Sequence, residues 1–391
     1  MCRTTMKPSL PALGLATLFS TQIALGGVPP LPSPPPPPPM PAPQISGVQA
    51  AVLLDVQTDQ VLMDEHGNRP LNPSGLVKLM TAYLLLQAEH QGLVRPDQNV
   101  QVSDRAWHAQ GSRMFIQPGL PVTVAQLERG LLIDGGNDAA IVIAQTVAGS
   151  VSGFVDLMNR DAAEMGLKHT HFANPDGLPA PDQRSTALDV ARLARILIEN
   201  HPSVLQVAGQ PKYTYNHITQ YNYNPLAGEK GINGLGVGLA SSKHWDLAVS
   251  ASRDGRSLVA VVLGAASRSS AGADASALLH YGFHGWQQHT VYAAGARVGE
   301  IRHLSWSPET LAVTTPKAIE VAVPRGGMGK LSSQFVPAPG LALPIRAREV
   351  VGQLELRWQG RLLKSVPVQA AQSVHPAGLV TRLWHRVRAW L

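Results

Sequence analysis

A hydroxyl and an amine stand four residues apart at the start of a predicted helix, at Ser74 and Lys78. Residues four apart lie on the same side of a helix, about one turn from each other, so these side chains can meet. An amine with a depressed pKa can take the proton of a hydroxyl that attacks a carbonyl. The pair therefore permits nucleophilic acyl chemistry. The simpler interpretation makes Ser74 the N-cap of the helix.

Other kinds of site find little support in the sequence. The only cysteine is Cys2, so disulfides, thiolate catalysis, cysteine zinc sites and iron–sulfur clusters are not expected. Asp138 falls in the first turn of a predicted helix, where a carboxylate is common. The glycine-rich stretch 231–238 lacks the Lys-Ser/Thr pair and the following helix of a phosphate loop. We expect no metal and no cofactor.

Composition and charge narrow the class of protein. The chain has 44% hydrophobic and 15% charged residues, which suits one or two buried cores and excludes wholesale disorder. Eleven of its 32 prolines lie in residues 29–43, whereas its 36 glycines are spread along the chain. The net charge of +6 is small and dispersed, so we do not expect nucleic-acid binding.

The N-terminal segment has the pattern of an export signal. Arg3 and Lys7 precede an apolar run, and small residues follow it, so residues 1–26 are predicted to be a signal peptide. A permanent membrane span is the alternative, although the run is short. Residues 27–45 are predicted to be a stiff, extended proline-rich spacer.

The elements that must position the polar residues indicate an α+β layout. Residues 46–290 read as strand, turn and strand, then several helices, then strands that complete the early sheet. Residues 295–370 show short alternating apolar runs, which predict a small all-β domain. Strands are expected at 51–54, 61–63, 247–252, 257–263, 319–323 and 354–358. Helices are expected to begin at 73 and to span 124–132, 137–147, 153–165 and 186–199. Thr123 is the expected cap of the helix at 124–132, and Ser152 that of the helix at 153–165.

The C-terminal segment, residues 377–391, is predicted to be a basic amphipathic helix. Apolar residues including Trp384 fall on one face and arginines elsewhere, which suits a helix lying in a lipid interface. Docking of this helix on the β domain is the alternative.

Together, longer stretches of the chain resemble the low-molecular-mass penicillin-binding proteins, the serine-type D-alanyl-D-alanine carboxypeptidases. The similarity runs through about residues 46–368, and the segments that carry it are 73–84, 112–119, 126–159, 170–178, 281–283 and 323–330. It implies a penicillin-binding or β-lactamase-like α+β domain, a small all-β domain and a C-terminal amphipathic membrane helix. It also implies that the pair His169 and His171 is structural, because the family has a similar Thr-His-Phe there.

The family's catalytic motifs are degenerate in this chain. Ser-x-x-Lys, which supplies the nucleophile and its base, aligns with Gly75 to Lys78, so the lysine is retained and the serine is lost. Ser-x-Asn, which supplies a second hydroxyl and an amide, aligns with Gly135 to Asn137, so only the asparagine is retained. Without a serine to deprotonate, Lys78 is expected to bond Asn137 across the cleft, and a residual functional role of Lys78 is the alternative. No lysine in the chain has a serine three residues before it, and no asparagine has one two before it.

The substrate-binding motif is also lost. Lys-Thr-Gly, which holds the terminal carboxylate of the substrate, aligns with Gly236, Val237 and Gly238. An Asn-Arg-Asn stretch of the family aligns with residues 222–224 and lacks its charge. The backbone amides of Gly75 and Leu239 could still form part of an oxyanion site.

We therefore expect an inactive homologue that binds or scaffolds peptidoglycan. In this interpretation its partners are stem peptides, held weakly without a covalent bond, the inner-membrane surface through the C-terminal helix, and a cell-wall protein. It would be exported to the periplasm and lie peripherally on the cytoplasmic membrane. Two alternatives stay open: an active D-alanyl-D-alanine carboxypeptidase that trims pentapeptides with non-standard residues such as Ser74 or Lys78, and a different hydrolase or partner-binding regulator.

Overall fold

A five-stranded antiparallel sheet with strand order β2-β1-β9-β8-β7 organises the N-terminal domain. The structure is a computed structural model that describes residues 40–241 and 244–378. The outer strands of this sheet are β2 and β7. Its strands are β1 (Ala50–Asp55), β2 (Gln60–Glu65), β7 (Ile232–Ser241), β8 (His244–Arg253) and β9 (Arg256–Ala265).

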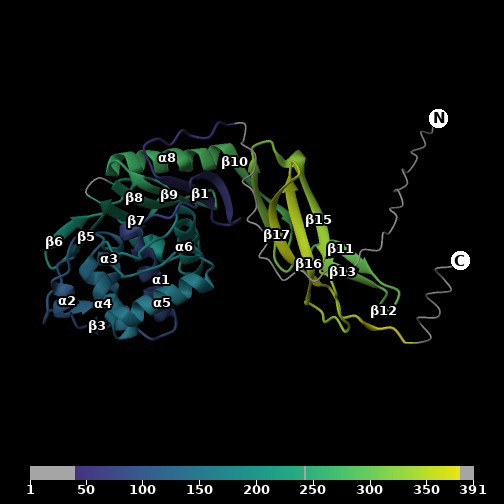
Figure 1. Ribbon diagram of the computed structural model, residues 1–391, viewed down its shortest axis with the longest axis horizontal. Helices are drawn as coiled ribbons and strands as arrows, with labels where there is room; N and C mark the ends of the chain where they lie inside the picture. The colour runs from purple at the N-terminus through teal and green to yellow at the C-terminus, as the bar shows by residue number, and fades with distance from the viewer. Residues whose placement is uncertain (1–39, 242–243, 379–391) are drawn as a thin grey trace. The chain divides into compact units, whose positions relative to one another are not determined.

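Both faces of the sheet are covered. Along β1, Val52 and Leu54 belong to the core shared with the helical layer, and Leu53 belongs to the core beneath α8 (Arg268–Gly285). Figure 1 shows α8 running along its face of the sheet. Successive side chains of a strand point to opposite faces, so a strand covered on both faces is apolar throughout. That is why the predicted strand at 51–54 reads as an unbroken apolar run.

The predicted helices are confirmed, with small shifts at their ends. Thr123 caps its helix through a capping box with Gln126, as expected. The predicted cap Ser152 is wrong, because Ser150 accepts the hydrogen bond from the Gly153 amide and the helix begins at residue 151. The main helices are α1 (Lys78–His90), α3 (Val124–Leu132), α4 (Asn137–Ala148), α5 (Val151–Glu164) and α6 (Ala187–Asn200).

Shorter elements complete the N-terminal domain. A single 3-10 turn, η1, precedes α1 directly, and a small hairpin joins β5 to β6. These elements are η1 (Ser74–Val77), α2 (Asp104–Trp107), α7 (Val204–Ala208), β3 (Asn99–Val100), β4 (Val122–Thr123), β5 (Lys212–Tyr215) and β6 (Ile218–Tyr221).

An all-β domain follows, as predicted, with its own apolar core. Its larger sheet has the order β11-β13-β17-β16-β15. Buried side chains, among them Trp306, Val313 and Trp358, form the core of the domain. The elements are β10 (Trp286–Tyr292), β11 (Arg297–Arg302), β12 (Trp306–Ser307), β13 (Thr310–Thr314), β14 (Ile319–Pro324), η2 (Met328–Lys330), β15 (Leu331–Pro337), β16 (Val350–Trp358), β17 (Arg361–Ala370) and β18 (His375–Pro376).

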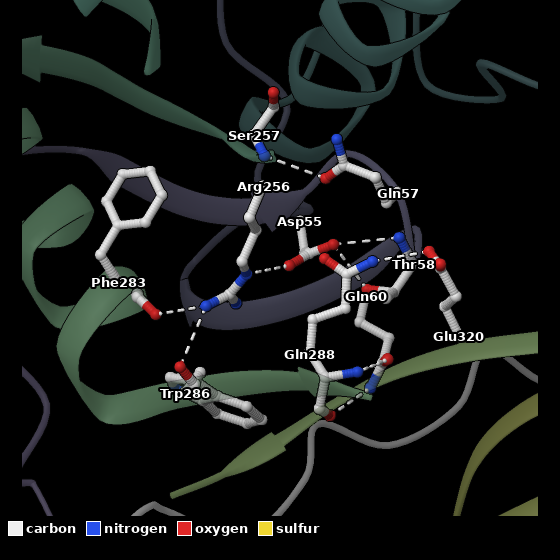
Figure 2. A network of polar contacts seen from close by, with 12 residues as sticks. Asp55, Gln57, Thr58, Gln60, Arg256, Ser257, Phe283, Trp286, Gln288 and Glu320 are labelled. Carbon is white, nitrogen blue, oxygen red and sulfur yellow. Dashed lines mark hydrogen bonds and ion pairs between the residues drawn. The ribbon is translucent and has the colours of Figure 1, made fainter. Parts of the chain in front are cut away.

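Polar contacts join the edge strand β2 to β14. The Gln60 side chain accepts a hydrogen bond from the Ala322 amide at 2.6 Å and donates one to the Ala322 carbonyl at 3.0 Å, as one strand would to another. Close by, Arg256 Nε donates to Asp55 Oδ2 at 2.7 Å in a buried ion pair (Figure 2).

Three predicted segments lie wholly or partly outside the described residues, namely the signal peptide at 1–26, residues 27–39 of the proline-rich spacer and residues 379–391 of the C-terminal helix. Within the described part of the chain, no single helix is long and apolar enough to cross a membrane. The helices α4 and α5 pass that test only as a pair, by length and composition, and they are bent by 83°.

Candidate active site

Residues predicted from distant parts of the sequence line one cavity of about 20 Å³. The start of the helical segment supplies Gly75 and Lys78, the loop before α4 supplies Gly135, and β7 supplies Gly236 and Val237. A cavity of this volume holds about one water molecule. The structure therefore brings the predicted positions together and leaves no room between them for a peptide.

Strand β7 packs directly against the turn that carries position 75. A Cβ at Gly75 would lie 2.6 Å from the carbonyl oxygen of Val237 and 3.0 Å from the Cα of Gly238. A Cβ at Gly238 would in turn lie 2.0 Å from the Ser74 hydroxyl and 2.6 Å from the Gly75 amide. Only a pair of glycines allows this approach, so the strand backbone occupies the space of the missing nucleophile.

The position of the second lost serine is also adapted to glycine. Gly135 has a φ of +64°, a left-handed backbone conformation that residues other than glycine rarely adopt. The Tyr223 ring lies 3.9 Å from where a Cβ at Gly135 would stand, and Tyr223 also lines the cavity. Serine at this position would strain the backbone of the loop.

Ser74 does not cap the helix with its side chain, which corrects the sequence-based expectation. Its hydroxyl donates a 2.6 Å hydrogen bond to Asp246 Oδ2 near the start of β8, and both residues are buried. Its own amide is satisfied by Asn72, and Pro73 occupies the cap position. Burial raises the pKa of Asp246 to about 6, although the bonds from Ser74 and from the Gly264 amide oppose the rise.

Lys78 is buried and retains the depressed pKa that a general base needs. Its Nζ donates to the backbone carbonyl of Asp176 at 2.5 Å. Burial lowers its pKa to about 8, while the nearby carboxylates of Asp176, Asp138 and Asp134 oppose that change. The described residues give Lys78 no bond to Asn137, the partner suggested by the sequence.

Asn137 and its neighbour Asp138 fix the loop on the far side of the cavity. Asn137 Nδ2 donates to the Gln110 carbonyl at 2.7 Å, while its Oδ1 is buried without a partner among the described residues. Asp138, in the first turn of α4 as predicted, accepts hydrogen bonds from the amides of three consecutive residues, 114–116. Both side chains therefore serve loop structure.

Asp134 is a second buried carboxyl beside the cavity. Gln220 from β6 donates to its Oδ2 at 2.5 Å, and its Oδ1 has no partner among the described residues. Burial raises the pKa of Asp134 to about 7, with a smaller contribution from Asp138, while Lys78 lowers it. Burial thus favours the neutral carboxyl up to a higher pH than for an exposed aspartate.

The remaining predicted residues have structural positions. Leu239 lies in β7, and its backbone pairs with Trp245. His171 pairs with Arg184 through the backbone, and the His169 amide donates to Asp189. Within residues 40–241 and 244–378, no three His, Cys, Asp or Glu side chains come close enough together to hold a metal ion.

Comparisons with known proteins identify both domains. Residues 39–267 match the model of the family described as D-alanyl-D-alanine carboxypeptidase, and the chain is 34% identical to DacD of Salmonella typhimurium over 88% of its length and 90% of the relative's. This chain belongs to the D-alanyl-D-alanine carboxypeptidase family. Residues 286–376 match the C-terminal domain of penicillin-binding protein 5.

Other members of the carboxypeptidase family agree in sequence and fold. DacC of Escherichia coli is 31% identical, and the match covers 88% of each chain. The crystal structure of penicillin-binding protein 5 from Haemophilus influenzae superimposes with a TM-score of 0.80 at 27% identity, over 86% of this chain and 99% of that one. The resemblance inferred from the sequence is thereby confirmed, together with the expected α+β domain and the all-β domain.

Sequence reasoning missed three contacts at the site of this family member. Asp246, Asp176 and Tyr223 contribute a buried acceptor, a carbonyl for Lys78 and a ring against Gly135. Asp246 alone gave a usable signal, because a lone carboxylate inside an apolar strand needs a buried partner. The other two depend on how loops fold onto the site.

Proposed function

We propose that this member of the D-alanyl-D-alanine carboxypeptidase family has lost covalent catalysis and acts as a non-catalytic, peptidoglycan-facing protein. The observation that carries the proposal is the contact between Gly75 and β7, which removes both the nucleophile and the space for one. Serine peptidases form an acyl-enzyme through that hydroxyl. In a comparable triad, removing the serine lowers the rate by about 10⁶-fold.

The alternative, an active carboxypeptidase with non-standard residues, draws support from Lys78 and meets an obstacle at Ser74. The pKa of Lys78, lowered to about 8, suits a base at neutral pH. Ser74, however, is buried and donates its hydroxyl proton to Asp246 rather than facing the cavity lined by Lys78. Nucleophilic attack tolerates little misplacement, so this geometry favours the non-catalytic role.

The ligand in this proposal is the peptidoglycan stem peptide, by analogy with relatives named for cleavage of D-alanyl-D-alanine. The cavity of about 20 Å³ cannot take a peptide terminus unless β7 separates from η1. We therefore expect weak, non-covalent binding. The same proposal includes a cell-wall protein as a second binding partner.

The cellular setting is also proposed from the sequence. A signal peptide at residues 1–26 would export the chain to the periplasm. A basic amphipathic helix at residues 377–391 would then hold it on the cytoplasmic membrane surface. Membership of a cell-wall enzyme family supports this arrangement.

Release of D-alanine from a pentapeptide ending in D-alanyl-D-alanine tests the proposed function. E. coli DacC, which is named as a carboxypeptidase, serves as the positive control. We expect no release above background from this protein, and the same result from Lys78→Ala. Release that Lys78→Ala abolishes would establish the active alternative and refute the proposal.

A further inference from the structure

A second cavity, of about 610 Å³, lies at the end of α8, away from the candidate active site. The β8–β9 turn, the last turn of α8, β10 and the turn after β14 surround it. Three arginines, Arg253, Arg256 and Arg325, line it together with one carboxylate, Asp254. We call it the arginine cavity.

Arg256 forms a fixed wall of the arginine cavity. Its Nε donates to Asp55, and its Nη1 donates to the carbonyls of Gly282 at 2.9 Å and Trp286 at 3.0 Å. Figure 2 shows the guanidinium held between Asp55 and Trp286. Its Nη2 is buried and has no partner among the described residues, which leaves one donor of this group unused.

Arg325 is held in place by backbone carbonyls alone, with no carboxylate among the described residues. Its Nε donates to the His284 carbonyl at 2.6 Å and its Nη2 to the Phe283 carbonyl at 3.2 Å. These are among the last carbonyls of α8, which lack helical partners. Arg325 and Arg256 therefore have a structural role, because both donate hydrogen bonds to carbonyls at the C-terminus of α8.

Capping does not explain Arg253. Its guanidinium lies over the Phe283 ring, 4.7 Å from the ring centroid. In the described part of the chain it donates no hydrogen bond to a carbonyl of α8. Among the described residues, no carboxylate or carbonyl accepts a hydrogen bond from it, and the adjacent Asp254 forms no ion pair with it. Stacking fixes the plane of the group while its five N–H donors stay available.

We propose that the arginine cavity binds a phosphate group, independently of the proposed function. Guanidinium groups match the oxygens of phosphate and carboxylate with paired N–H donors. Here the donors come from separate chain segments around one space. A tetrahedral phosphate can accept from several directions at once, whereas the two coplanar oxygens of a carboxylate suit a single guanidinium.

Calorimetric titration of the full-length protein with inorganic phosphate at low ionic strength tests the proposal. We expect saturable binding to one site, weakened about 10- to 100-fold by Arg253→Gln and by Arg325→Gln. Arg253→Gln removes no hydrogen bond of the described fold, so it keeps the test valid if the other variant unfolds. Arg105→Gln, the same change at an exposed arginine of α2, is the matched control and should bind like wild type.

Two further titrations define the ligand. Sodium acetate should bind at least about tenfold more weakly than phosphate. A short-chain phosphatidylglycerol below its micelle concentration separates the sources: tighter binding than phosphate assigns a lipid headgroup, and equal or weaker binding assigns a free phosphate. The proposal is overturned if phosphate fails to bind, if both arginine variants bind it like wild type, or if acetate binds as tightly.

Discussion

The carbonyl oxygen of Val237 lies only 2.6 Å from where a Cβ at Gly75 would stand. The two glycines that allow this approach, Gly75 and Gly238, face each other across the contact between η1 and β7. At this position, where the family motif has the nucleophile, the strand backbone therefore occupies the space that a side chain would need.

Gly75→Ser alone should not restore acylation. The new Cβ meets backbone atoms rather than the flexible end of a side chain, so β7 must shift. Overpacking of this kind costs about 1–3 kcal/mol of unfolding free energy. We expect no labelling by a fluorescent penicillin and a lower midpoint in urea.

The matched control is Gly329→Ser, since a Cβ there has nothing within 4 Å. It should leave the urea midpoint almost unchanged. Penicillin labelling of Gly75→Ser, with stability equal to that of the control, would show that β7 does not obstruct the position.

Ser74→Ala should destabilise the protein without changing its chemistry. The substitution leaves the buried Asp246 carboxyl without its 2.6 Å donor, which costs about 1–3 kcal/mol. Urea unfolding measures the loss. Ser269→Ala removes an exposed hydroxyl of α8 and should be neutral.

Hydrolysis of the pentapeptide would contradict the structural role given to Ser74 if it depended on the Ser74 hydroxyl. If the wild-type protein hydrolyses the pentapeptide and Ser74→Ala abolishes that activity at full stability, Ser74 is the nucleophile and its burial in this structure is not its working state.

Much of the fold was predictable because its signals are local. Apolar periodicity located the main helices, and Thr123 was identified as a cap from its residue type. Ser150 was missed in favour of Ser152, since both are good caps and only the backbone geometry separates them. The helix α8 was missed because its serines, alanines and glycines carry a weak helical pattern.

The sequence predicted which positions form the candidate site, but not which groups their side chains contact. Motif spacing located Gly75, Lys78 and Gly135, which the structure brings to one cavity. The sequence suggested Asn137 as the partner of Lys78, whereas the structure supplies the Asp176 carbonyl. That choice depends on long-range loop packing, which residue spacing does not encode.

Asp134 should make stability fall as the pH rises. Its pKa is raised to about 7 in the folded protein from 3.8, so the folded state binds more protons than the unfolded state between these values. The free energy of unfolding therefore decreases from about pH 4 to pH 7, by an amount on the order of a few kcal/mol for this group. Asp134→Asn should flatten that decrease.

Urea unfolding at a series of pH values measures the effect. Asp156→Asn removes an exposed carboxylate of α5 and is the control. The slopes of wild type and Asp156→Asn should agree, while that of Asp134→Asn is shallower. Equal slopes in all three proteins would contradict the assignment.

The buried Asp55–Arg256 pair should matter far more than an exposed pair. Asp55→Ala leaves the Arg256 charge buried and unpaired, which costs about 3–5 kcal/mol of unfolding free energy. Asp97→Ala breaks an exposed pair with Arg95 and should cost less than about 1 kcal/mol. Similar urea midpoints for the two variants would contradict the role given to Asp55.

The most direct test of the central claim is the intact mass of the unmodified full-length protein after incubation with benzylpenicillin, with E. coli DacC treated in parallel. The absence of a nucleophile at Gly75 and the burial of Ser74 predict no change in mass while DacC is acylated. A gain of one penicilloyl mass by this protein would show that covalent chemistry survives, and would contradict the account.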